Sequence, residues 1–140
     1  MPIYEYLHTV SFEETNLVGN VYYANYVRWQ GRCREMFLRD QAPEILTQLS
    51  QGLALATVRV SCEYYSELYA FDQVAIRMQL GEAIQNRITM LFEYWRLKDG
   101  EEELVAKGEQ QTACMQREGE KLVPIPIPTV LREALKVYSN

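Results

Sequence analysis

Large apolar side chains recur with helical spacing in the N-terminal third of the chain. From about Tyr22 to Arg39 they stand three and four positions apart, which gathers them on one face of a helix. A helix of this length is about 25 Å long. Pro43 then permits a short second helix from Glu44 to about Gln51, which Gly52 ends. The members of the apolar face are Tyr22, Tyr26, Trp29, Cys33 and Phe37.

Alternation of apolar and polar residues predicts strands after these helices. From Gln73 to about Ile84, apolar side chains alternate with polar or small ones, as in a strand that is buried on one face. The Asp-Gly pair within Lys98–Glu101 predicts a hairpin turn. Four other segments are rich in β-forming residues and are predicted strands. They are Tyr4 to about Glu13, Leu53 to Tyr65, Arg87 to Leu97 and Leu104 to Met115.

Prolines mark the approach to the C-terminal end. Pro124, Pro126 and Pro128 alternate with apolar residues and predict an extended connector. A short closing helix is expected from Thr129 to Tyr138, with Thr129 as its N-cap.

The order of these elements indicates the fold class. One strand, one long helix and an antiparallel run of strands form an α+β pattern, and 140 residues suit a single domain, 1–140. Such a chain can bury about two-thirds of the surface of its unfolded form. The acidic run Glu101–Glu103 beside the predicted turn is expected to be a solvated loop.

Charge and composition exclude several classes of function. A net charge of −5 argues against a nucleic-acid partner. No apolar run reaches the roughly 18 residues of a membrane span, and the first residues lack the features of a signal peptide. The cysteines Cys33, Cys62 and Cys114 lack metal or redox spacing and are expected to be reduced thiols, so we expect a cytoplasmic protein. No metal-ligand cluster or dinucleotide fingerprint occurs, and no cofactor or metal is expected.

The segment from Phe12 to Leu38 is the most informative part of the chain. It combines a loop, a glycine turn at Gly19 and the start of the long helix. This segment resembles the signature of the hot-dog-fold acyl thioesterases, the 4-hydroxybenzoyl-CoA thioesterase-like family, and most closely the enediyne polyketide thioesterases. The resemblance is close over residues 11–40 and weaker elsewhere. It implies a hot-dog fold, with an antiparallel sheet wrapped around the long helix, which the pattern alone does not distinguish from other α+β layouts.

The resemblance also indicates site residues in the loop. Asn16 stands where most members of that family carry a catalytic aspartate, and the enediyne group shares the asparagine. An amide is neither a nucleophile nor a general base, but it can hold a water or a thioester carbonyl by hydrogen bonds. The plainer interpretation is a turn asparagine. The Tyr23 backbone amide matches the oxyanion-hole donor of the family, since the first amides of a helix lack intrahelical partners.

Three helix residues complete the candidate site. Arg34 matches the arginine that accompanies the asparagine in the enediyne group, and its guanidinium offers five donors. The plainer interpretation of Arg34 is a salt bridge on the surface. Glu35 is the nearest candidate for a general base, although adjacent helix residues point about 100° apart. Tyr26 is a candidate for the wall of an acyl tunnel, with packing in the core as the plainer interpretation.

Other hydrolase and lyase classes fit less well. His8 is the only histidine, and it lies in the first predicted strand, away from the helix-proximal histidine of hot-dog dehydratases. No Gly-x-Ser-x-Gly nucleophile elbow occurs.

The resemblance implies hydrolysis of an acyl-carrier-protein thioester, which releases a linear polyene or 3-oxo acyl chain from an iterative polyketide synthase in enediyne antibiotic biosynthesis. The implied partners are that carrier protein and its acyl-pantetheine thioester. Because hot-dog sites form between subunits, a homodimer or a dimer of dimers (a homotetramer) is expected. Since the chain is acidic, docking on an acidic carrier would require a local basic patch. Two alternatives are a general acyl-CoA thioesterase and a non-catalytic acyl-binding protein.

Overall fold

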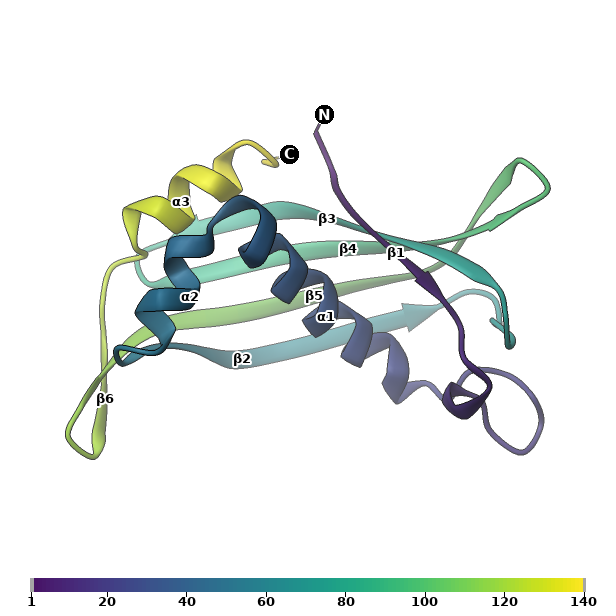
Figure 1. Cartoon of the computed structure of the whole chain (residues 1–140), viewed down its shortest axis with the longest axis horizontal. Helices are drawn as coiled ribbons and strands as arrows, with labels where there is room; N and C mark the ends of the chain where they lie inside the picture. Colours follow the sequence, from purple (N-terminus) through teal and green to yellow (C-terminus); the bar gives the residue numbers. More distant parts are fainter. Residues whose placement is uncertain (1, 140) are drawn as a thin grey trace.

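A six-stranded antiparallel sheet curves around one long helix in the computed structural model, which describes residues 2–139 (Figure 1). The strand order is β1-β3-β4-β5-β2, and β6 pairs with β5. The strands are β1 Tyr4–Thr9, β2 Leu53–Tyr64, β3 Gln73–Ile84, β4 Arg87–Lys98, β5 Glu101–Glu118 and β6 Lys121–Pro124. The helices are α1 Ala24–Gln41, α2 Pro43–Leu49 and α3 Thr129–Lys136. This arrangement confirms the α+β class and the wrapped sheet that the resemblance implies.

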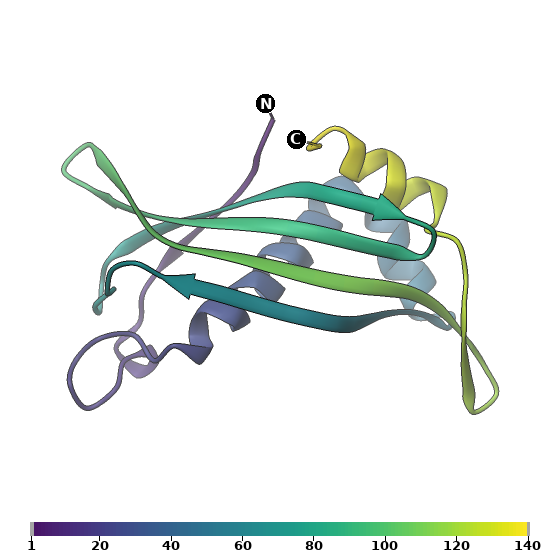
Figure 2. The same ribbon diagram turned by 180° about the vertical axis from the view of Figure 1, so that it is seen from behind.

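All three helices lie on one face of the sheet, and the opposite face is open (Figures 1 and 2). The core therefore fills the space between α1 and the curved sheet. The predicted apolar face of α1 is buried there from Tyr26 to Phe37. It meets the alternate residues of β3 and β4, and each large side chain buried in this way contributes about 1.5–3 kcal/mol to the free energy of unfolding. The buried residues of these two strands include Ile76, Met78, Ile88, Met90, Phe92 and Tyr94.

The entry to the long helix differs from the prediction. β1 ends at Thr9, and Phe12–Glu14 form a single 3₁₀ turn, so the predicted strand as far as Glu13 is wrong. The turn forms because the Glu14 carboxylate accepts a hydrogen bond from the Ser11 amide at 2.8 Å, the arrangement of a capping box. Helix α1 begins two residues later than predicted, because the Tyr22 amide bonds the Glu14 carbonyl at 2.9 Å.

The acidic run after the hairpin turn belongs to a strand. Asp99 and Gly100 have φ values of 53° and 78°, which fits the predicted Asp-Gly turn. β5 then begins at Glu101, so the predicted solvated loop is wrong. The physical reason is charge pairing across the sheet: Glu102 bonds Arg77 on β3, and Glu103 bonds Arg96 on β4.

The C-terminal segment confirms the closing helix and corrects its details. Residues Lys121–Pro124 form the strand β6, which was not predicted and overlaps the expected connector only at Pro124. Helix α3 starts at Thr129 but ends at Lys136, before the predicted Tyr138. The N-cap is Pro128 rather than Thr129, because the Arg132 amide bonds the Pro128 carbonyl at 2.9 Å. None of the helices described is long and apolar enough to cross a membrane.

Candidate active site

Residues 15–21, called here the 15–21 loop, form a tight turn between Glu14 and helix α1. The Asn16 amide donates to the Asn20 carbonyl at 2.9 Å, and the Gly19 amide donates to the Asn16 carbonyl at 2.9 Å. Gly19 has a φ of 97°, a left-handed conformation that favours glycine. The Asn16 Oδ1 accepts the Val18 amide at 3.0 Å, so this side chain makes the local contact of a turn asparagine. Its Nδ2 is bonded to none of the described residues and lies in the exposed part of the loop.

The Tyr23 amide stands at the N-terminal end of α1 without an acceptor among residues 2–139. Tyr23 already has helical angles, with φ −56° and ψ −31°, so this N–H is aligned with the helix axis. Its carbonyl accepts hydrogen bonds from the Tyr64 hydroxyl at 2.9 Å and from the Tyr26 amide at 3.3 Å. Unpaired amides at this end carry the partial positive charge of the helix dipole, which favours an anionic oxygen.

The Glu14 carboxylate is a site feature that the sequence reasoning missed. It accepts hydrogen bonds from the Ser11 amide at 2.8 Å, His8 Nε2 at 2.9 Å and Trp29 Nε1 at 2.7 Å. Burial raises the pKa of Glu14, but these three hydrogen bonds outweigh it and hold the pKa below its usual value. The local signal was the Ser-x-x-Glu motif of a capping box. His8 therefore serves as a partner of Glu14 in this structure.

The Glu14 carbonyl closes the base of the 15–21 loop. It accepts both the Tyr22 amide at 2.9 Å and Asn25 Nδ2 at 2.8 Å. One residue thus ties the start of the loop to the first turn of α1. An open cavity of about 420 Å³ lies beside it and is lined in part by Arg28 and Arg32.

Arg34 lies between α1 and the sheet, away from the loop. Its Nη1 donates to Gln110 Oε1 on β5 at 2.8 Å, and burial lowers the pKa of the guanidinium although the charge of Glu35 opposes this. No described carboxylate lies within 4.0 Å of it, so the guanidinium is hydrogen-bonded to a neutral amide and has no ion-pair partner among residues 2–139.

A polar strip continues from Arg34 along this seam. Gln30 lies one helical turn earlier and donates to the Ser61 carbonyl at 3.1 Å. Its Oε1 is buried without a partner among the described residues, as is Thr112 Oγ1 on β5. Buried polar atoms of this kind are costly unless a water or a ligand satisfies them.

The two remaining candidates lie in different surroundings. Glu35 is exposed and pairs with Arg32 at 3.0 Å, so it faces away from the Arg34–Gln110 contact. Tyr26 is buried, with its ring edge-to-face on Tyr64 at 4.8 Å, and burial raises its pKa to about 12. These surroundings fit the plainer interpretation of Tyr26, which is packing in the core.

One chain therefore gathers only part of the candidate set. Asn16, Gly19 and the Tyr23 amide share the end of the molecule where α1 begins. Arg34 lies about 15 Å farther along α1, and no hydrogen bond or ion pair joins it to the 15–21 loop. Within residues 2–139, no cluster of three or more His, Cys, Asp and Glu residues could hold a metal ion.

Comparisons with known proteins identify the family and the fold of this chain. The family model described as "Thioesterase-like superfamily" matches residues 10–135. The chain belongs to the thioesterase-like superfamily. A protein of Aquifex aeolicus (strain VF5) named "Putative esterase" is 32% identical over 135 residues, which cover 96% of this chain and 97% of that protein. Family membership makes this chain a hot-dog thioester hydrolase and confirms the resemblance to that family.

Solved structures of thioesterases superpose closely on this superfamily member. The dynemicin thioesterase, whose crystal structures reveal effects of polyene binding, is 47% identical with a TM-score of 0.96, and 99% of each chain is covered. A 4-hydroxybenzoyl-CoA thioesterase is 19% identical with a TM-score of 0.84, covering 94% of this chain and 96% of the other. The second match supports the fold alone.

Proposed function

We propose that this thioesterase releases a linear polyene or 3-oxo acyl chain from the pantetheine arm of an acyl carrier protein in enediyne polyketide biosynthesis. The observation that carries the proposal is the free Tyr23 amide at the start of α1, beside a loop whose key position holds neutral Asn16. The high identity to the dynemicin thioesterase supports the choice of substrate.

Hydrolysis follows from these groups without a catalytic carboxylate. A water oxygen attacks the thioester carbonyl carbon, and the carbonyl oxygen becomes an oxyanion that accepts a hydrogen bond from the Tyr23 amide. Each preorganised donor of this kind contributes about 3 kcal/mol to transition-state stabilisation. Asn16 Nδ2 donates to the same oxygen or orients the water. The carbon–sulfur bond then breaks, and the thiol, with a pKa near ~8.5, leaves with the proton of the water.

Arg34 completes the proposed site in a homodimer or dimer of dimers. A single chain keeps Arg34 and Asn16 apart, so a site built between two copies is the simplest way to unite them. β2 forms one edge of the sheet, and its residues Val58 and Tyr64 are exposed, which leaves an edge for a second copy. The guanidinium would then stabilise negative charge on the thioester or the product carboxylate.

Three substrates test the proposal. The same acyl group is presented on a carrier protein, on pantetheine and on coenzyme A, and thiol release is followed with a chromogenic thiol reagent. Faster turnover on the carrier protein is expected. Preference for acyl-CoA would indicate a general acyl-CoA thioesterase, and binding without turnover would indicate an acyl-binding protein. Free Cys33, Cys62 and Cys114 support the proposed cytoplasmic location.

A further inference from the structure

We propose that Arg96, on strand β4, is a positioning residue for the 15–21 loop. It acts through residues 66–72, called here the strap, which connect β2 to β3 and lie between Arg96 and the loop. The inference rests on the proposed function, because the loop carries Asn16 and leads to the Tyr23 amide.

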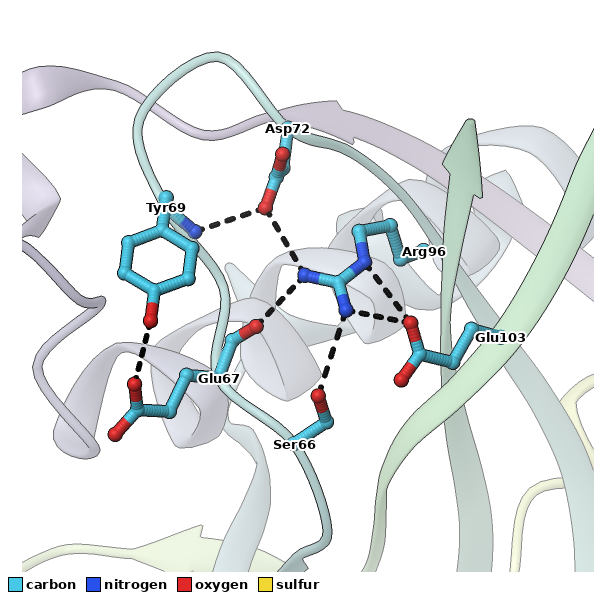
Figure 3. A network of polar contacts seen from close by, with 6 residues as sticks. All are labelled: Ser66, Glu67, Tyr69, Asp72, Arg96 and Glu103. Atoms are coloured by element: carbon cyan, nitrogen blue, oxygen red, sulfur yellow. Dashed lines mark hydrogen bonds and ion pairs between the residues drawn. The ribbon is translucent and has the colours of Figure 1, made fainter. Parts of the chain in front are cut away.

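Arg96 is the centre of a polar network on the strap (Figure 3). Its Nη1 donates to the Glu67 carbonyl at 2.8 Å and to Asp72 Oδ2 at 3.4 Å. Its Nη2 donates to Ser66 Oγ at 3.4 Å, and its Nε donates to the Glu103 carboxylate at 3.2 Å. The planar guanidinium thus bonds main-chain and side-chain acceptors of the strap at the same time, which a point charge such as lysine does less well.

The strap in turn holds the far end of the 15–21 loop. The Val21 amide donates to the Leu68 carbonyl at 2.8 Å, and Leu68 is fully buried. Asn20 Nδ2 donates to one oxygen of the Glu67 carboxylate at 3.2 Å, while the Tyr69 hydroxyl donates to the other at 2.6 Å. Asn20 and Val21 lie two to three residues before Tyr23, so the strap helps to fix the position of the chain that leads to the Tyr23 amide, together with the Tyr22–Glu14 bond.

A strained residue in the strap supports this assignment. Phe71 has a φ of 73°, although its side chain is bulky and 75% exposed. Such a conformation costs about 1–3 kcal/mol and persists only where surrounding contacts fix it. The Phe71 amide donates to the Val10 carbonyl at 2.8 Å. Asp72 adds the remaining contacts: its amide bonds the Tyr69 carbonyl at 3.1 Å, and its carboxylate accepts the Tyr69 amide at 2.9 Å and Arg96.

Arg77 provides a matched control on the neighbouring strand. Its side chain is 20% exposed, compared with 18% for Arg96, and it also pairs with two carboxylates. Those partners, Glu5 on β1 and Glu102 on β5, lie outside the strap and the 15–21 loop. Arg77 also lies over the Trp95 ring at 5.6 Å, so removing it measures the loss of two ion pairs and a cation–π contact in the sheet, without touching the strap.

The test compares Arg96→Met with Arg77→Met in the full chain. With acyl-pantetheine as substrate, Arg96→Met is expected to lower kcat about tenfold to a hundredfold, because small displacements of an oxyanion hole are costly. KM should stay within about twofold, since the loss is confined to the transition state. Arg77→Met should leave both constants unchanged. An unchanged kcat in Arg96→Met, an equal loss in both variants, or a change confined to KM would overturn the proposal.

Amide hydrogen exchange separates this inference from the proposed function. The Val21 amide should exchange at least about tenfold faster in Arg96→Met than in wild type and Arg77→Met. If wild type hydrolyses no thioester, the proposed function fails, while the exchange rates still report whether Arg96 holds the loop. Equal exchange rates in all three proteins would refute the positioning role.

A second variant guards against misfolding of Arg96→Met. Asn20→Ala removes the Glu67 link and leaves Arg96 in place. It should lower kcat in the same direction, and the double variant should lose less than the product of the two separate losses. Fully multiplicative losses would contradict a shared route through the strap.

Discussion

Arg34 and Gln110 are joined by a 2.8 Å hydrogen bond from the guanidinium Nη1 to the amide oxygen, across the seam between α1 and β5. The amide orients the guanidinium but leaves its charge unneutralised, which is costly even in this partly buried position. An arginine held in this way is ready for an anionic or carbonyl oxygen of a ligand. This contact separates Arg34 from the exposed arginines of α1, such as Arg32, which pairs with Glu35.

Arg34→Ala should depress turnover of acyl-pantetheine and of the carrier-bound substrate alike, because the guanidinium is proposed to act on the thioester. If Arg34 served only to dock an acidic carrier, the loss would appear with the carrier protein alone. That loss would also shrink as salt rises, since exposed charges are screened over about 8–10 Å at physiological ionic strength. Kinetics on both substrates at two salt concentrations decide the matter. An intact rate on acyl-pantetheine would remove Arg34 from the active site.

The Asn16→Ala variant should lose most of its hydrolytic activity and remain folded. The side chain is exposed and its one contact within the described residues is the Val18 amide, so truncation disturbs little packing. Loss of one key donor to an oxyanion lowers kcat by about 10²–10³. Steady-state hydrolysis measured beside a melting curve tests this. Activity within about threefold of wild type, far short of that loss, would rule out the role.

Asn16→Asp should lower turnover rather than restore it. A carboxylate at this position would stand near the developing oxyanion and repel it, and it would lose the donor of Nδ2. The variant is isosteric, so a changed rate reports chemistry rather than shape. A rise in kcat on simple acyl-CoA substrates would show that the site still accepts a catalytic acid.

Glu14→Gln should lower the stability of the protein at neutral pH. Glutamine has one acceptor oxygen, and its NH2 group cannot accept a hydrogen bond. If that oxygen accepts from Ser11 and His8, the bond from the Trp29 N–H is lost. One charge-assisted hydrogen bond contributes about 1.5–3 kcal/mol to the free energy of unfolding.

The pH dependence of stability gives a separate check on Glu14. Its folded pKa lies below the ordinary 4.5, so the carboxylate stabilises the fold above that value, and this contribution is lost as pH falls through the folded pKa. The free energy of unfolding, measured with denaturant from about pH 6 to pH 3, should therefore fall more steeply for wild type than for Glu14→Gln. Parallel curves would contradict the prediction.

Gly108→Ala and Gly31→Ala should change stability in opposite directions. A Cβ at Gly108 would stand 2.2 Å from Gln30 Nε2 and 2.9 Å from the Ser61 carbonyl, so the Gln30–Ser61 bond must break. Overpacking of this kind costs about 1–3 kcal/mol. Gly31 lies within α1, and a Cβ there would meet no atom of its surroundings within 4 Å. Alanine at this position should raise the free energy of unfolding by about 0.5–1 kcal/mol. Denaturant unfolding of both variants measures the difference, and a Gly108→Ala variant as stable as wild type would contradict it.

Local patterns predicted the elements of this fold well. The spacing from Tyr26 to Phe37 identified the buried face of α1, and the alternation in β3 gave both of its bounds, Gln73 and Ile84. The loop residues Asn16 and Gly19 and the free Tyr23 amide could also be located from the motif and the start of the helix.

Features that depend on contacts between distant segments were missed. Glu14 is bonded by His8 and Trp29, and Arg96 meets the strap and β5, so neither role is visible in one stretch of sequence. The acidic run at Glu101 was misplaced for the same reason, since the pattern of one strand does not reveal the arginines of its neighbours.

The two hydrogen bonds to the Glu14 carbonyl make the 15–21 loop a closed module. Its ends meet at one atom, so the exposed residues Leu17 and Val18 at its tip can change without displacing α1 or the sheet. Insertions and exchanges are tolerated best in such closed surface segments. Descendants of this scaffold can therefore diversify by exchanging the two tip residues beside Asn16, while the strap contacts of Asn20 and Val21 and the stability of the rest of the molecule are inherited unchanged.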